Sequence, residues 1–357
     1  MKKAAKRLEQ LLLYSASMNG RTTWFSFRGT ICVGTLLLIA ASMHGQNLFV
    51  GEWETDCIYE YAPDGTRTTF ASGIVAPAGL AFDKVGNLFV TDHGSNVYEF
   101  KTDGTKSVFF STSNNYGTFS LAFDSSGNLF EGNNGGFPSG NNIYKITTNG
   151  IGTLFATNIS CVFGMAFDRA GDLFALNWFY GGEDIDEFTP DGTPSRFATG
   201  IGQAFGLAFD GAGNLYGGDQ INGVIYEYAP DGTRRNFATN VFPNALAFNS
   251  AGELFEADGN GNIYKFTPSG VKSTFASSLG DPVPLAFQPV PGLKGVITNG
   301  TFQLTVSMPS PYFSTIVQFS PDLVNWVNVY TNTPPFTFTN SMATSSSQCF
   351  YRAVLGP

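Results

Sequence analysis

The chain has 357 residues, which is enough for two or three domains with sizeable cores. Aromatic residues make up 15% of it and charged residues only 13%, and the 42 Gly and 18 Pro supply frequent turns. This composition is typical of a turn-rich β protein and argues against a disordered chain or a helical bundle. Residues 46–357 hold 13 basic and 27 acidic side chains, a net charge of −14, which argues against nucleic acid as a partner.

Residues 1–45 are predicted to be a signal peptide. Basic residues ending at Arg28 precede an apolar run at 30–41, which is shorter than the ~18–20 residues that a membrane-spanning helix needs. Small residues allow cleavage before Met43 or before Gln46, and Met18 is an alternative start of the chain. We therefore expect an exported protein, secreted, periplasmic or at the cell surface, with no membrane span after cleavage.

Three cysteines remain after such a cleavage: Cys57, Cys161 and Cys349. An odd number cannot all pair within one chain, and their spacing matches no CxxC metal pattern. We expect free thiols that pack as small hydrophobes.

A short motif, Leu or Met followed by Ala-Phe and then Asp, Asn or Gln, recurs every 39 to 44 residues. Its copies begin at Leu80, Leu121, Met165, Leu207, Leu246 and Leu285. This period is the length of a four-stranded propeller blade, so each copy is taken as the first strand, a, of a blade. A Gly turn leads to strand b, as at 87–89, then to an alternating strand c, as at 97–100, and to a strand d that carries a Phe.

The two ends of the repeat region are incomplete in complementary ways. Segments 47–50, 58–61 and 70–71 have the signatures of strands b, c and d with no strand a before them, and Leu285 to Gln288 is a strand a alone. We predict that these four strands share one blade and close a ring, which leaves no free sheet edge. The predicted fold of residues 46–290 is a six-bladed β-propeller.

The pattern PxGLAFDxxGNLFVxD, from Pro77 to Asp92, resembles NHL-repeat and TolB-like propellers and the wider gluconolactonase (senescence marker protein) superfamily. The resemblance extends over about two thirds of the chain. Related blades serve as lactonases, lyases, receptors and scaffolds, so it implies an architecture more than an activity.

One face of the predicted ring is expected to carry any binding site, because strand a begins and strand b ends there. Four residues after the Leu of strand b, every blade has an acid or an amide: Glu52, Asp92, Asn133, Asn177, Asp219 and Asp258. These oxygens could line a cation or sugar site, or each could cap its own turn. Their presence in all six blades favours capping. Asp-Gly pairs recur in the turns that join strand c to strand d. They lack the ligand spacing of a calcium loop, so we expect the Asp side chains to stabilise these turns.

The d-to-a loops reach the same face. The gluconolactonase resemblance implies a divalent metal held by Glu, Asn and Asp just before the Gly of strand a. The corresponding positions here are Ala78, Phe119, Phe163, Phe205, Asn244 and Val283. Only Asn244 could ligate, so we expect no metal site, no cofactor and no lactonase activity. These Phe residues, with Trp53 and Trp178, could instead form an aromatic funnel for an apolar or carbohydrate ligand, or pack in the core. His93 stands beside Asp92 at the same face, without the partners that a lyase-like mechanism would need.

Residues 291–357 break the repeat and are predicted to be a small β-sandwich. Segments 320–326 and 350–352 resemble a C-terminal module of secreted bacterial proteins. Our leading functional hypothesis is an exported, non-catalytic propeller that binds a small ligand or a protein partner on its d–a/b–c face. The alternatives are a divergent gluconolactonase-like hydrolase that uses the Asp and Asn ring, and a structural surface scaffold.

Overall fold

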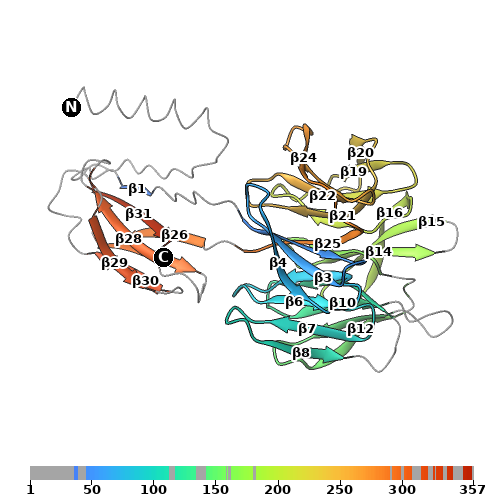
Figure 1. Cartoon of the computed structure of the whole chain (residues 1–357), viewed down its shortest axis with the longest axis horizontal. Coiled ribbons are helices and arrows are strands. Elements are labelled where there is room, and N and C mark those ends of the chain that lie inside the picture. Colours follow the sequence, from blue (N-terminus) through green and yellow to red (C-terminus); the bar gives the residue numbers. More distant parts are fainter. Residues whose placement is uncertain are drawn as a thin grey trace. The chain divides into compact units, whose positions relative to one another are not determined.

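The computed structural model describes residues 36–38, 46–111, 117–133, 142–157, 159, 162–179, 182–289, 292–298, 301–307, 315–320, 325, 327–332, 336–340 and 349–355. The chain divides into two compact units, one of Gly45–Pro289 and one of Met1–His44 with Val290–Pro357. The described residues form strands, turns and loops (Figure 1). Among them there is no helix of the length and hydropathy needed to cross a membrane.

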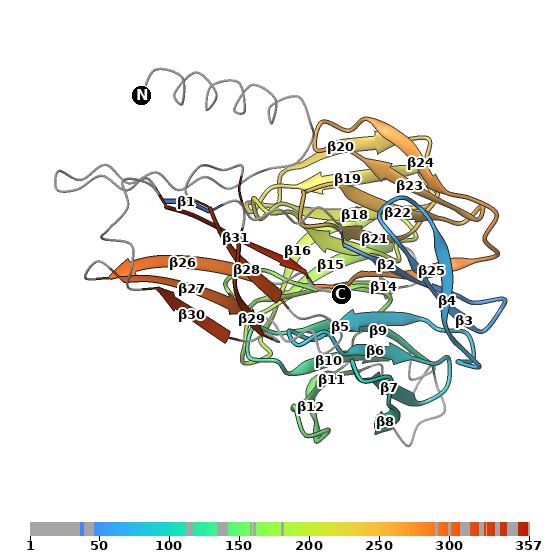
Figure 2. The same ribbon diagram turned by 60° about the vertical axis from the view of Figure 1, so that its left-hand side comes forward.

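Six four-stranded antiparallel sheets make up the first unit, and Figures 1 and 2 follow them in chain order from blue to orange. The innermost strands are β5 (Gly79–Phe82), β9 (Thr118–Phe123), β13 (Met165–Phe167), β17 (Leu207–Phe209), β21 (Pro243–Phe248) and β25 (Pro282–Phe287). The second strands are β2 (Leu48–Glu52), β6 (Leu88–Thr91), β10 (Leu129–Asn133), β14 (Leu173–Phe179), β18 (Leu215–Asp219) and β22 (Leu254–Asp258).

The third strands are β3 (Cys57–Tyr61), β7 (Asn96–Phe100), β11 (Asn142–Ile146), β15 (Gly182–Phe188), β19 (Val224–Tyr228) and β23 (Asn262–Phe266). The outermost strands are β4 (Arg67–Ser72), β8 (Lys106–Ser111), β12 (Gly152–Thr157), β16 (Pro194–Ile201), β20 (Arg234–Thr239) and β24 (Lys272–Ala276). Each innermost strand contacts the innermost strands of the two neighbouring sheets, so the six sheets form a ring. The predicted six-bladed propeller is confirmed.

The closing blade combines the two ends of the repeat region. Strand β25 pairs antiparallel with β2, with Leu285 opposite Val50 and Phe287 opposite Leu48, and β3 and β4 complete the sheet. The backbone amide of Gln288 also donates to the carbonyl of Asn47. The last innermost strand therefore belongs to the blade that the N-terminal strands begin, as predicted.

The interfaces between blades explain the large number of Phe residues. In each interface the aromatic residue of strand b contacts a Phe of its own outermost strand and a Phe of the next innermost strand. Phe89, for example, lies 4.9 Å from Phe109 and 5.1 Å from Phe123 between ring centroids, in edge-to-face geometry. Equivalent pairs recur in all six interfaces. Each pair contributes roughly 0.5–1.5 kcal/mol beyond its burial, so the repeated Phe positions hold the ring together.

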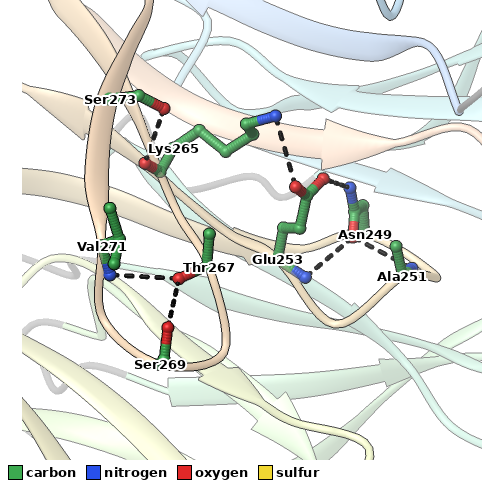
Figure 3. A network of polar contacts seen from close by, with 8 residues as sticks. All are labelled: Asn249, Ala251, Glu253, Lys265, Thr267, Ser269, Val271 and Ser273. Atoms are coloured by element: carbon green, nitrogen blue, oxygen red, sulfur yellow. Dashed lines mark hydrogen bonds and ion pairs between the residues drawn. The ribbon is translucent and has the colours of Figure 1, made fainter. Parts of the chain in front are cut away.

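In the first five copies of the repeat motif, the acid or amide that ends the copy holds the turn between strands a and b. Figure 3 shows this in the last blade, where Asn249 Oδ1 accepts the backbone N–H groups of Ala251 at 3.0 Å and Glu253 at 2.9 Å. The Glu253 carboxylate forms an ion pair with Lys265, with Nζ and Oε1 3.2 Å apart. The Asp-Gly turns between strands c and d work in the same way, with Asp64 Oδ1 accepting the amide of Thr66 at 2.9 Å.

The second unit contains two sheets. One has the order β26 (Gly292–Thr298), β27 (Thr301–Ser307) and β30 (Phe336–Asn340). The other has the order β1 (Leu36–Leu38), β31 (Cys349–Leu355), β28 (Thr315–Ser320) and β29 (Val327–Asn332). The described residues after Val290 thus lie almost entirely in β-strands, as expected, while the packing of the two sheets as a sandwich stays a prediction.

Strand β1 lies inside the expected signal peptide and pairs in parallel with β31, Leu37 opposite Phe350. The rest of that segment lies outside the described residues, as does Cys161, so export and cleavage stay predictions. Cys57 is a free, half-buried thiol.

Candidate functional site

The innermost strands enclose a cavity of about 510 Å³ on the propeller axis. Its floor is a ring of one large apolar residue from each blade, none more than 8% exposed: Leu80, Leu121, Met165, Leu207, Leu246 and Leu285. The layer above holds mostly small residues: Gly79, Ser120, Gly164, Gly206, Ala245 and Pro284. The upper layer holds the positions that the sequence placed before strand a: Ala78, Phe119, Phe163, Phe205, Asn244 and Val283.

The middle layer contains glycines because the innermost strands approach each other closely there. A Cβ on Gly164 would lie 2.9 Å from the Phe205 carbonyl oxygen, and one on Gly206 would lie 2.7 Å from the Leu246 backbone nitrogen. Both distances are too short for real contacts, so a side chain would force neighbouring blades apart. The glycines therefore let the upper-layer side chains converge around one cavity.

Aromatic rings form one wall of the cavity. Consecutive ring centroids lie 5.4 Å apart from Trp53 to His93, 5.4 Å from His93 to Phe119, 4.9 Å from Phe119 to Phe163 and 5.0 Å from Phe163 to Phe205. All four contacts are edge-to-face. Trp53 and the three Phe residues line the cavity, while the exposed His93 lies between two of them. We call Trp53, Phe119, Phe163 and Phe205 the aromatic wall.

The other side of the cavity carries four polar side chains, Glu54, Gln220, Asn244 and Asp281, which we call the polar wall, together with Phe242. Asn244 Nδ2 donates to Asp281 Oδ1 at 2.9 Å, and Gln220 Nε2 donates to Asn244 Oδ1. Burial raises the pKa of Asp281, the Asn244 hydrogen bond opposes this, and the charges of Glu54 and Glu52 raise it further. None of the described residues that line the cavity is basic, so its polar wall carries uncompensated negative charge.

The ring of acids and amides at the ends of the second strands does not line the cavity. In five of its six members, Glu52, Asp92, Asn133, Asp219 and Asp258, a side-chain oxygen accepts backbone N–H groups of nearby loops. In the sixth, Asn177 Nδ2 donates to Asp186 Oδ2 at 2.5 Å. In the first five residues this geometry is that of loop capping, the interpretation that the sixfold repetition favoured, whereas this bond of Asn177 joins two side chains.

The remaining candidates divide between the cavity and its surroundings. The predicted site residues Trp53, Phe163, Phe205 and Asn244 line the cavity. Trp178 belongs to β14 by its backbone, opposite Glu183, and its side chain lies outside the described part of the structure. Within that part, no group of three or more His, Cys, Asp and Glu residues is placed to hold a metal ion.

Sequence reasoning missed four cavity residues: Glu54, Gln220, Phe242 and Asp281. A signal was present for two of them. Phe242 stands two residues before Asn244, and Asp281 stands two residues before Val283, so the loop register before strand a could have identified both. The indole Nε1 of Trp53 is buried and has no hydrogen-bond partner among the described residues.

Two carboxyl groups are buried behind the floor of the cavity. Glu131 pairs with Leu121 and Glu256 pairs with Leu246, and both side chains are fully buried with no hydrogen bond to either carboxyl oxygen among the described residues. Burial raises the pKa of Glu131 to about 8. Burial also raises the pKa of Glu256, to about 7, although the Lys272 charge opposes the shift. Both groups are therefore held largely as neutral acids at slightly acid pH.

Comparison with known proteins finds a likeness in structure only. No protein-family model matches the chain, and no curated protein has a similar sequence. A gluconolactonase from Xanthomonas campestris aligns with a TM-score of 0.50 at 18% identity, over 64% of this chain and 82% of its own. Virginiamycin B lyase from Staphylococcus aureus aligns with a TM-score of 0.52 at 13% identity, over 73% and 88%. The PQQ-bound aldose sugar dehydrogenase from Streptomyces coelicolor aligns with a TM-score of 0.50 at 16% identity, over 67% and 90%. The described fold is thus a six-bladed, gluconolactonase-like β-propeller.

Proposed function

We propose that this protein is an exported, non-catalytic binding module that holds a small ligand in its axial cavity. The observation that carries the proposal is the division of the cavity into an aromatic wall and a polar wall above an apolar floor. Its volume of about 510 Å³ lies within the range of known ligand pockets, ~300–1,000 Å³. Aromatic surface supplies affinity through burial, and a few polar groups fix the orientation of the ligand.

The identity of the upper-layer residues supports binding over catalysis. Five of the six positions that the gluconolactonase resemblance relates to metal binding are Ala78, Phe119, Phe163, Phe205 and Val283, none of which can ligate. A lactonase of that type needs a metal-bound water, and an apolar side chain adds desolvation without charge. The predicted signal peptide supports a role outside the cytoplasm.

A second candidate is a divergent lactonase-like hydrolase, which the polar wall favours. Asn244, the one position that could ligate, lies 2.9 Å from the Asp281 carboxylate. Glu54 lines the same side of the cavity. These residues bring together oxygen atoms that the sequence alone left separate.

The two candidates are separated by metal analysis and a lactone assay on the purified protein. We expect no stoichiometric metal and no lactone hydrolysis above background with added Ca²⁺, Zn²⁺ or Mn²⁺. We also expect saturable binding of a small ligand, followed by ligand-observed NMR, that Phe163→Leu weakens and the distant Asp103→Asn leaves unchanged. A metal-dependent hydrolysis that Asn244→Ala abolishes would establish the hydrolase instead, and a protein with no saturable ligand in a broad screen would be a structural scaffold.

A further inference from the structure

We propose that the ligand of the axial cavity is an organic cation, an ammonium group carried on an apolar body. This inference rests on the proposed binding function and names the class of ligand. Three features of the cavity carry it: the excess of carboxylates at one side, the aromatic wall, and the internal hydrogen bonding of the amides.

Three carboxylates gather around the loop before β25. Glu52 accepts the backbone N–H of Gly280, and a Cβ on Gly280 would lie 2.7 Å from Glu54 Oε2 and 3.2 Å from Glu52 Oε1. Asp281 is the next residue along the chain and lines the cavity with Glu54. The ion pairs found among the described residues do not include any of these three groups.

No described basic side chain therefore forms an ion pair with this carboxylate cluster. The pKa of Asp281 reflects this, because burial and then the neighbouring Glu54 and Glu52 charges raise it against the Asn244 hydrogen bond. A bound cation would reverse the electrostatic part of that shift, since an opposite charge within about 4–6 Å favours the ionised carboxylate. The site thus gains from binding positive charge and loses from binding an anion.

The amides of the polar wall are already engaged. Gln220 donates to Asn244, and Asn244 donates to Asp281, so these two side chains direct their donors toward protein acceptors. The carboxylates of Glu54 and Asp281 are acceptors when ionised, which suits a positively charged ligand group that has no acceptor of its own. An ammonium group, with or without N–H, is such a group, whereas a sugar hydroxyl is uncharged and also accepts.

The aromatic wall selects an organic cation over a bare metal ion. A calcium ion needs about 6–8 oxygen ligands, whereas this cavity combines two lining carboxylates with four Phe rings and a Trp ring. An ammonium ion is attracted to the faces of such rings, most strongly to Trp, and its hydrocarbon body can rest on the ring of Leu and Met at the floor. The carboxylates and the aromatic wall therefore suit the charged end of one amphipathic cation, and the apolar floor suits its hydrocarbon end.

The test compares a cation with a neutral molecule of the same shape. In 3,3-dimethylbutyl acetate a carbon atom replaces the ammonium nitrogen of acetylcholine. The two esters therefore have nearly the same shape and differ in charge. We expect acetylcholine to bind at least tenfold more tightly by titration calorimetry or ligand-observed NMR. Asp281→Asn and Glu54→Gln should each reduce this preference severalfold and leave the affinity of the neutral ester nearly unchanged. Phe163→Leu should weaken both molecules.

Asp103→Asn is the matched control, because it removes one carboxylate from a fully exposed turn outside the cavity and should leave the preference unchanged. Equal binding of the two esters, or a preference that survives both cavity substitutions, would overturn the cation proposal and leave the binding function standing. If Ca²⁺ or Zn²⁺ bound stoichiometrically and displaced acetylcholine, the ligand of the cavity would be a metal ion, and the organic-cation proposal would be wrong. If neither ester binds, the cation proposal is wrong, and the broad ligand screen then decides separately whether the cavity binds anything.

Discussion

The buried carboxyl of Glu131 predicts a specific dependence of stability on pH. Its pKa is about 8 in the folded protein, against an ordinary value of 4.5, because burial penalises the charged form. Between these two pH values the unfolded chain releases the proton while the folded protein keeps it. The contribution of Glu131 is therefore fully present below about pH 4.5 and is lost as the pH rises toward 8.

The size of the effect follows from the shift. Each pH unit in this window changes the free energy of unfolding by ~1.4 kcal/mol per group, so the whole window corresponds to about 5 kcal/mol as an upper figure. This is comparable with the whole stability of a typical domain, about 5–15 kcal/mol. Glu131→Gln keeps the shape and removes the ionisation, so its stability relative to the unsubstituted protein should rise steadily from pH 5 to pH 8.

The assay is urea unfolding of both proteins at pH 5, 6, 7 and 8, followed by tryptophan fluorescence and circular dichroism. Glu256→Gln should behave similarly, with its gain levelling off near pH 7. Asp103→Asn serves as the control, because side-chain and backbone hydrogen bonds from Thr105 lower the pKa of Asp103, away from this pH range. A stability difference between Glu131→Gln and the unsubstituted protein that stays constant from pH 5 to pH 8 would refute the assignment of a buried neutral acid.

Three further predictions concern the ring itself. Gly206→Ala should lower the free energy of unfolding by about 1–3 kcal/mol, because its Cβ would lie 2.7 Å from the Leu246 backbone nitrogen, whereas Gly211→Ala, with nothing within 4 Å, should be nearly neutral in thermal melts. Phe89→Ala removes two edge-to-face contacts at a blade interface and should lower stability by about 3–5 kcal/mol in urea unfolding, and a loss below 1 kcal/mol would contradict the role given to these pairs. Deleting residues 285–288 removes the second half of β25 and should abolish cooperative melting and monomeric elution, so an unchanged melting temperature would mean that the ring does not close through this strand.

The architecture could be read from the sequence because it depends on local, repeated signals. Each blade carries the same alternation of apolar and polar residues and the same turn residues, and these determine where strands begin and end. The unmatched strand at Leu285 and the three strands that begin at Asn47 could be combined only in one blade, so counting was enough to predict closure. The capping role of the acids at the ends of the second strands was also favoured by their repetition alone.

The character of the cavity depended on the tertiary structure, because its polar wall joins residues that are far apart in the chain. Glu54 and Asp281 come together only when β25 completes the first blade, and Asn244, an isolated amide in the sequence, acquires partners from two neighbouring blades. Repetition predicts what the blades share, whereas a site is made by the positions at which they differ. Distances across blade interfaces decide whether such differing side chains meet and whether a carboxyl such as Glu131 finds a partner among the described residues. The spacing of residues along the chain carries no information on these distances.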